Sequence, residues 1–204
     1  MNKEEKLKKI LPVLKKLYPD PHTPLKYSNP FELYVAVALS AQQTDVGVNA
    51  VTVDLFKKYK TLADYQKASY EEFDNDIKKI NFHRNKAKAI LNAAQMVEEK
   101  FKGKIPDTME DLLSLPFVGR KTANVILQEI FGKNVGVVVD THVRRLSNLF
   151  GFSTQKDPEK IEKDLMEIVP QKEWHSFALG LILYGREYCK ASCKHIDCPL
   201  KEFI

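Results

Sequence analysis

Cysteines and long apolar runs are scarce or missing in this chain, and each absence excludes a class of protein. Only three of the 204 residues are cysteines, and all lie between residues 189 and 198. So few cysteines, so closely spaced, do not make the disulfide framework of a small secreted scaffold. The apolar run 177–184 is far shorter than the ~20 residues of a transmembrane helix. The lysine-rich N-terminus has no apolar signal core, so we expect a cytoplasmic protein without a membrane partner.

Helical periodicity is what the sequence does have. Apolar residues recur at intervals of three and four, which is typical of amphipathic helices. This pattern predicts helices over residues 7–14, 31–39, 51–59, 87–101 and 158–169. We therefore expect an all-α fold, and a hydrophobic content of 44% is ample for one or two packed domains.

A pair of helices joined by a very short turn is predicted near the middle of the chain. Thr108 and Asp111 have the spacing of a capping box, so a short helix should begin there and end at Pro116. Apolar residues then recur at helical spacing over 121–131, and Gly132 should stop this second helix. The sequence thus predicts a helix-hairpin-helix element over about residues 108–131.

The turn of this hairpin has the composition of a phosphate-binding site. Gly119 permits a close approach, and the N–H groups at the start of the following helix are available to an anion. Lys121 then lies on the first helical turn, beside that anion site. By itself the pattern also fits an ordinary surface lysine after an inter-helix turn.

Asp140 ends a buried apolar run, 135–139, at the point where another amphipathic helix begins. A carboxylate at such a position is a helix N-cap. A cap also fixes the position of the carboxylate, so the structural role and a functional role are compatible. The order of the two elements, a hairpin lysine followed by a capping aspartate, favours the functional interpretation.

These motifs resemble those of the endonuclease III family, within the helix-hairpin-helix superfamily of DNA glycosylases. The resemblance covers residues from about 30 to 190. It rests on four segments, which are LSAQQTD at 39–45, the hairpin LPFVGRKTA at 115–123, VDTHV at 139–143 and LYGR at 183–186. Four matches in the same order make coincidence negligible.

The resemblance implies roles for individual residues. Lys121 matches the catalytic lysine and Asp140 the catalytic aspartate. Gln42 matches the residue that fills the gap left by a flipped nucleotide; its structural alternative is a solvated helix residue. Phe82 stands where the family places a wedge in the duplex; its structural alternative is a core aromatic. Further DNA contacts are expected at His83, Arg84, Val118, Gly119, Arg120, Thr122 and Arg144.

The implied activity is that of a base-excision-repair DNA glycosylase and abasic-site lyase acting on oxidised pyrimidines. A neutral lysine amine attacks C1′, expels the base and forms a Schiff base, after which loss of the C2′ proton eliminates the 3′ phosphate. The partner is double-stranded DNA with a damaged base or abasic site, bound by a nucleoid-associated monomer. A net charge of +5 has the sign that such a partner requires.

Two other functions remain open from the sequence. One is a monofunctional glycosylase for mismatched or alkylated bases, which releases a free base without cutting the strand. The other is a non-catalytic helix-hairpin-helix module, in which Lys121 and Asp140 are only a phosphate contact and a cap. The presence of all three residues, Lys121, Asp140 and Gln42, disfavours the binding module.

The resemblance implies two lobes with a DNA cleft between them. A central six-helix domain spans residues 25–134 and includes the hairpin. Residues 1–24 and 135–204 form the second helical domain from both chain ends.

The C-terminal loop departs from the family. Relatives often carry four cysteines, spaced C-x6-C-x2-C-x5-C, around a [4Fe–4S] cluster that normally takes four ligands. When the chain is aligned on Cys198, His195 takes the second family position and Ile204 the fourth. We therefore expect a degenerate, metal-free loop over 189–204, a doubtful cluster, and chemistry that requires no cofactor. The alternative is a zinc or iron site built from Cys189, Cys193, His195 and Cys198.

A second departure is Phe117, where the family usually has glycine. Phenylalanine does not readily adopt positive φ. We therefore expect Phe117 to disturb the hairpin's phosphate contact.

Overall fold

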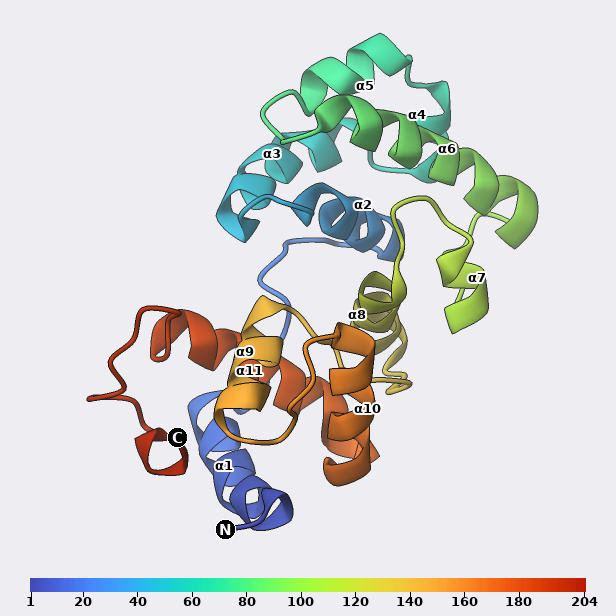
Figure 1. Ribbon diagram of the computed structural model, residues 1–204. Coiled ribbons are helices and arrows are strands. Elements are labelled where there is room, and N and C mark those ends of the chain that lie inside the picture. The colour runs from blue at the N-terminus through green and yellow to red at the C-terminus, as the bar shows by residue number, and fades with distance from the viewer. The chain divides into compact units, whose positions relative to one another are not determined.

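The structure, a computed structural model, describes all 204 residues and is helical throughout (Figure 1). The prediction of an all-α fold is confirmed. None of the helices combines the length and the apolar character needed to cross a membrane. The chain divides into two compact units, which we call the continuous unit (residues 23–131) and the discontinuous unit (residues 1–22 and 132–204).

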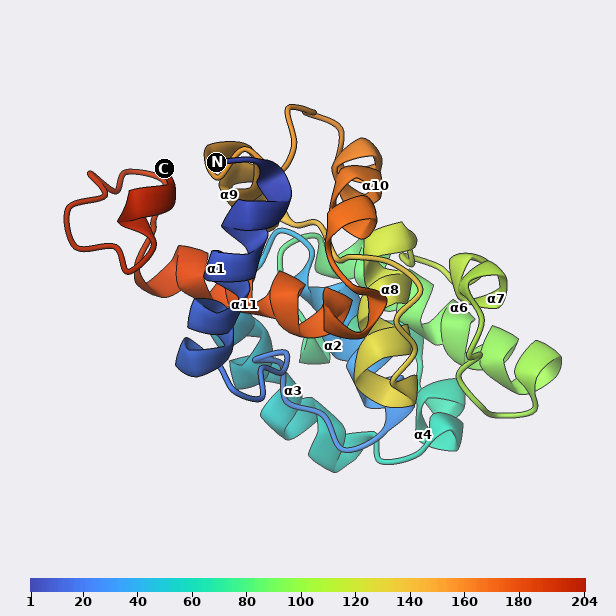
Figure 2. The same cartoon turned by 90° about the horizontal axis from the view of Figure 1, so that it is seen from below.

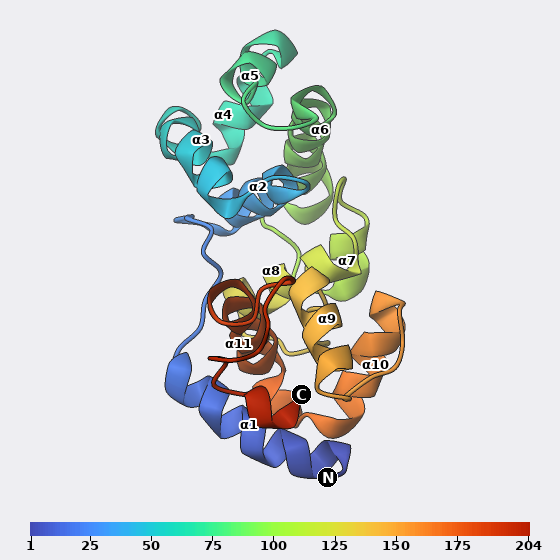
Figure 3. The ribbon, with the colours of Figure 1, turned by 60° about the vertical axis from the view of Figure 1, so that its left-hand side comes forward.

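The continuous unit packs seven helices around a core rich in aromatic side chains. The rings of Tyr65 and Phe73 meet edge to face at a centroid distance of 5.8 Å, and both side chains are buried. Helices α4 and α5 pack against α6, and α2 contacts α3, α6 and α8 (Figure 3). The helices are α2 (Pro30–Ser40), α3 (Asp45–Lys58), α4 (Leu62–Lys67), α5 (Tyr70–Asp76), α6 (His83–Phe101), α7 (Met109–Leu113) and α8 (Arg120–Phe131).

The discontinuous unit is made from both ends of the chain. Helix α1 packs against α11, which also contacts α9 (Figure 2). Phe150, Phe152, Phe177 and Tyr184 bring their rings together in its core. Its elements are α1 (Lys3–Leu17), α9 (Thr141–Leu149), α10 (Pro158–Ile168), the 3₁₀ turn η1 (Gln171–Glu173), α11 (Trp174–Glu187) and the 3₁₀ turn η2 (Lys201–Phe203).

Side-chain caps decide where several helices begin. Thr44 accepts a hydrogen bond from the Gly47 N–H at 3.1 Å, so α3 begins at Asp45, six residues before the periodic pattern predicts. Helices α4 and α5 were not predicted, because each is shorter than two helical repeats of the apolar pattern. Their caps, Thr61 and Ser69, are the signal that marks their starts.

Candidate functional site

The predicted helix-hairpin-helix element is present as α7 and α8. The Thr108 hydroxyl accepts the Asp111 N–H at 3.2 Å, which confirms the cap. The carbonyl of Pro116 then accepts a 2.8 Å hydrogen bond from the buried Tyr34 hydroxyl on α2. This bond fixes the turn to the core of the continuous unit. Helix α8 begins at Arg120, and Gly132 ends it with a φ of +62°.

Phe117 takes the conformation that its side chain disfavours. Its φ is +60°, so the expectation that a phenylalanine avoids positive φ here is wrong. The side chain is 45% exposed, so it does not have to fit a packed core while the backbone turns. Its neighbour Pro116 is held by Tyr34, and this contact offsets part of the conformational cost of about 1–2 kcal/mol.

Gly119 leaves open space on the outer side of the turn. A β-carbon built on Gly119 would meet no other atom within 4 Å. The first N–H groups of α8 have no carbonyl of their own helix to bind. An anion can therefore approach this part of the backbone closely.

Lys121 is exposed on the first turn of α8, next to this open backbone. Arg120 and Thr122 flank it and are half-buried, whereas Ala123 behind them is fully buried. The apolar face of α8 thus fixes the helix while the lysine stays accessible.

Asp140 caps α9 in the discontinuous unit, as predicted. Its Oδ1 accepts the backbone N–H groups of His142 and Val143, each at 2.8 Å. Residues 136–139 before it are buried, although Val135 at the start of the predicted apolar run is 40% exposed. Two bonds to a single oxygen hold the carboxylate in one orientation and leave Oδ2 for another partner.

Basic side chains surround a hollow at the other end of α9. It is lined by Arg144, Arg145, Asn148, Thr154, Gln155 and Lys156. Arg144 is exposed there, whereas Arg145 turns toward the C-terminal loop. The positive charge of the hollow suits a phosphate group.

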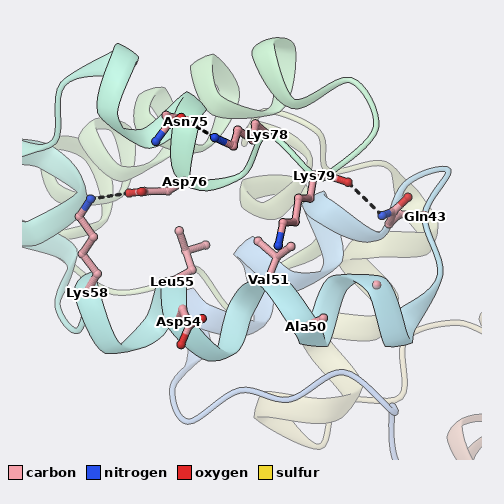
Figure 4. Close-up of a pocket in the computed structure, with 11 residues that line it drawn as sticks. Gln43, Ala50, Val51, Asp54, Leu55, Lys58, Asn75, Asp76, Lys78 and Lys79 are labelled. Atoms are coloured by element: carbon pink, nitrogen blue, oxygen red, sulfur yellow. Dashed lines mark hydrogen bonds and ion pairs between the residues drawn. The ribbon is translucent and has the colours of Figure 1, made fainter.

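Gln42 and Phe82 stand on two loops of the continuous unit that one asparagine joins. The Asn81 amide donates to the Gln42 carbonyl at 2.8 Å and to Gln43 Oε1 at 3.0 Å. Gln43 in turn reaches the Lys79 carbonyl, at the edge of the pocket drawn in Figure 4. Sequence reasoning missed Asn81, although it directly precedes Phe82.

Both loop residues adopt left-handed backbone conformations and point their side chains to solvent. The φ angles of Gln42 and Phe82 are +57° and +58°, and Phe82 is 61% exposed. The structural alternative for Phe82, a core aromatic, does not describe this arrangement. An exposed apolar ring on an ordered turn is suited to insertion between bases.

Lys86, which lies in the basic stretch after Phe82, is the buried cation behind the Gln42 loop. Its side chain is 1% exposed, and Nζ donates to the carbonyls of Leu39 at 2.8 Å and Ala41 at 2.7 Å. These carbonyls belong to the C-terminal end of α2, where a positive charge is favourable. Burial lowers the pKa of Lys86.

His83 and Arg84 begin α6, directly after Phe82. The His83 ring is half-buried and its Nδ1 lies 2.6 Å from Asp74 Oδ1, whereas Arg84 is exposed. Asp74 therefore competes with any phosphate for His83, and Arg84 is the more accessible cation of the two.

The C-terminal loop is a metal-binding cluster, so the expectation of a degenerate, metal-free loop is wrong. The ligand atoms of Cys189, Cys193, His195 and Cys198 all lie within 4.8 Å of one another. The sequence analysis gave these four residues only as an alternative zinc or iron site, because three cysteines do not complete the four ligands of a cluster; His195 supplies the fourth ligand. The cluster occupies the loop in which the resemblance places the ligands of a [4Fe–4S] cluster.

Comparison with known proteins identifies the family of the chain. Residues 35–171 match the family described as HhH-GPD superfamily base excision DNA repair protein. The chain is 45% identical to endonuclease III of Synechocystis over 190 residues, which are 93% of this chain and 87% of that protein.

Two solved structures share the fold over at least 98% of the chain. A non-covalent complex of endonuclease III with DNA matches with a TM-score of 0.93 and 41% identity, covering 100% of this chain and 95% of that one. A trapped covalent intermediate of endonuclease III with DNA matches with a TM-score of 0.91 and 42% identity, covering 98% and 94%.

Proposed function

Since the chain belongs to the endonuclease III family of base excision DNA repair proteins and is a DNA glycosylase with abasic-site lyase activity, we propose that Lys121 is its nucleophile and Asp140 the carboxylate that assists it. The observation that carries this proposal is the exposed amine of Lys121 on the first turn of α8, beside the open backbone at Gly119. A related protein of 42% identity is described as forming a covalent intermediate with DNA.

The reaction proceeds by covalent catalysis. The neutral Lys121 amine attacks C1′ of the deoxyribose, the C1′–N bond to the base breaks, and the base leaves with its electron pair and takes up a proton. Opening of the sugar ring gives a Schiff base at C1′. Loss of the now acidic C2′ proton then expels the 3′ phosphate, which cuts the strand. Asp140 stabilises the positive charge that develops on the sugar while the base departs.

Access to C1′ requires the nucleotide to leave the stack. Unstacking costs a few kcal/mol, less at a lesion. Phe82 enters the duplex as a wedge, and the Gln42 amide pairs with the orphaned base. Val118, Gly119, Arg120 and Thr122 bind the phosphate backbone at the hairpin, while His83, Arg84 and Arg144 bind neighbouring phosphates.

The substrates are oxidised or ring-saturated pyrimidines in duplex DNA, encountered in the cytoplasm at the nucleoid. The family membership supports this preference, and the bacterial relative supports this location. A panel of duplexes with one defined lesion each tests the preference. Excision concentrated on alkylated or mismatched bases would contradict it.

Borohydride trapping on a duplex with an abasic site tests the nucleophile. We expect a covalent adduct from the native protein and none from Lys121→Ala. Lys104→Ala, an exposed lysine of the same unit, is the control and should trap normally. An adduct from Lys121→Ala places the nucleophile elsewhere, and no adduct from the native protein despite duplex binding rejects the lyase mechanism.

A further inference from the structure

The four ligand atoms of the C-terminal loop lie unusually close together. Cys193 Sγ is 3.2 Å from Cys198 Sγ, and Cys189 Sγ is 3.5 Å from His195 Nδ1. No two of the four ligand atoms are more than 4.8 Å apart. This spacing is informative because it depends on how many metal ions the ligands share.

One ion and a cubane cluster require different separations. Ligands of a single tetrahedral Zn²⁺, at about 2.3 Å for sulfur and 2.0–2.1 Å for nitrogen, stand about 3.5–3.8 Å apart. In a [4Fe–4S] cubane each ligand binds a different iron. The distance between two irons therefore adds to the separation of their ligands, and the ligand atoms stand about 6 Å apart. The separations of 3.2 and 3.5 Å, and the upper limit of 4.8 Å, are much closer to those of a single ion than to those of the cubane.

We propose that Cys189, Cys193, His195 and Cys198 bind a single zinc ion in place of an iron–sulfur cluster. Three thiolates and one imidazole are a closed tetrahedral ligand set of the kind that structural zinc sites use. Binding releases the three thiol protons, since the thiolate is the ligand. Cys193 stands at none of the family's four cluster positions. A site that uses Cys193 as a ligand therefore differs from a family cluster site that has lost some of its ligands.

The residues around the loop suit the net charge of the proposed zinc site. Three thiolates and one dication leave a net charge of −1. Arg145 on α9 supplies the compensating positive charge, because it donates to Cys189 Sγ at 3.5 Å and also to the Cys189 carbonyl. The His195 N–H donates to Cys193 Sγ at 3.3 Å, a contact that stabilises a metal-bound thiolate.

The backbone at His195 adopts a left-handed conformation that suits a ligand role. His195 has a φ of +59°, a conformation that non-glycine residues adopt rarely. This bend places its N–H toward Cys193 while its ring nitrogen lies near Cys189. The ring and the main chain of one residue thus serve two of the three thiols.

The site would fasten the last segment of the chain to the discontinuous unit. Beyond the loop, the Leu200 N–H donates to the Tyr184 hydroxyl at 3.1 Å, and Lys6 Nζ donates to the Phe203 carbonyl at 3.0 Å. Zinc would add a cross-link within the loop that joins the end of α11 to this segment, beside Arg145 on α9. The expected role is therefore structural, and it goes beyond the proposed catalytic function.

Metal content measured without DNA tests the proposal, so its failure is distinct from failure of the proposed catalysis. Protein is made in medium that supplies both iron and zinc, purified without oxygen, and analysed for metals, acid-labile sulfide and free thiols. We expect one zinc per chain, no sulfide and no visible absorption. Iron with sulfide and a brown colour would overturn the proposal, as would absence of metal with free thiols or a disulfide.

Two variants sharpen the result. Cys193→Ser should lose most of the zinc and lower the melting temperature, whereas a cluster built on the family positions would be unaffected. Lys194→Ala, at an exposed neighbouring position, should keep a full equivalent. If Cys193→Ser unfolds, the native protein substituted with cobalt gives a second measurement, because tetrahedral thiolate coordination produces intense visible bands. A cobalt spectrum without them would also overturn the proposal.

Discussion

Lys86 Nζ donates a 2.7 Å hydrogen bond to the carbonyl oxygen of Ala41, the residue before Gln42. A buried lysine on α6 thereby holds the junction between the end of α2 and the loop that carries Gln42, the proposed gap-filling residue. Its partners are carbonyl oxygens, so its charge serves the backbone of this loop.

Replacing Lys86 by methionine should uncouple the loop from the core. Two buried carbonyls lose their donor, which we expect to cost about 1–3 kcal/mol of unfolding free energy. Because Gln42 is then less well placed, base excision should fall by about tenfold, equal to ~1.4 kcal/mol. Chemical denaturation and single-turnover excision measure the two effects. Lys100→Met, an exposed position on the same helix, should change neither, and full excision by Lys86→Met would show that Gln42 does not need this anchor.

Phe82→Gly should separate stability from function at the wedge. Glycine accepts the φ of +58° without strain, so stability should stay level or rise by up to about 1 kcal/mol. Excision should nevertheless fall by about tenfold or more, because the inserted ring is lost. Lys102→Gly is matched, since Lys102 has a φ of +54° at the other end of α6 and no proposed DNA contact. Equal excision by both variants would remove Phe82 from the site.

Asp140 can be tested as a cap and as a charge in separate variants. Asparagine also caps helices, so Asp140→Asn should keep the stability within about 0.5 kcal/mol while lowering the excision rate by about 10²-fold. Asp140→Ala loses both roles and should also cost about 1 kcal/mol of stability. Thermal melting and steady-state excision compare them. An active Asp140→Asn would leave Asp140 as a cap only.

Gly185 has little room for a side chain, which explains a glycine in the last turn of α11. A β-carbon there would lie 2.7 Å from Nδ1 and 3.1 Å from Cβ of His142. Gly185→Ala should therefore destabilise the protein by about 1–3 kcal/mol. Gly180→Ala on the same helix meets Leu14 at an ordinary 3.4 Å and should be neutral or stabilising by up to about 1 kcal/mol. Equal melting temperatures would contradict this difference.

The ion pair of Lys15 with Glu173 should give a pH-dependent contribution. The hydrogen bond from Lys15 lowers the pKa of Glu173. A lowered carboxyl pKa stabilises the fold above the pKa of the unfolded chain and ceases to do so as the pH falls through the folded value.

Lys15→Met should therefore lower stability at pH 7 by less than about 1 kcal/mol, because the lysine side chain is 48% exposed. The difference from the native protein should vanish once the pH has fallen below the lowered pKa of Glu173. Melting curves at several pH values measure it, with Lys16→Met as the control. A difference that persists in acid would assign the effect to packing.

Local features of the fold could be predicted from the sequence, whereas contacts between distant residues could not. The caps at Thr108 and Asp140 depend on neighbours within three residues, and both predictions are confirmed. Lys86 reaches Ala41 across 45 positions and Asn81 reaches Gln42 across 39, so no local pattern indicates them.

The C-terminal loop was misjudged for the same reason. Cysteine spacing measures distance along the chain, but a metal site depends on where ligand atoms meet. The left-handed turn at His195 brings its ring to Cys189, and this turn has no sequence signal in a histidine. Phe117 is a similar case, since its positive φ is imposed by the hairpin rather than favoured by the residue.

The division of the chain into units also dictates an order of assembly during protein synthesis. Helix α1 leaves the ribosome before the continuous unit, but α11, against which it packs, follows only after the whole continuous unit has been made. Domains generally fold as soon as their residues are complete. The continuous unit can thus fold before α11 has been made. Until then α11 does not cover the apolar face of α1, which consists of Leu7, Ile10 and Leu14. A nascent chain interrupted before residue 158 would carry a finished hairpin together with a first helix that still lacks both of its packing partners, α10 and α11.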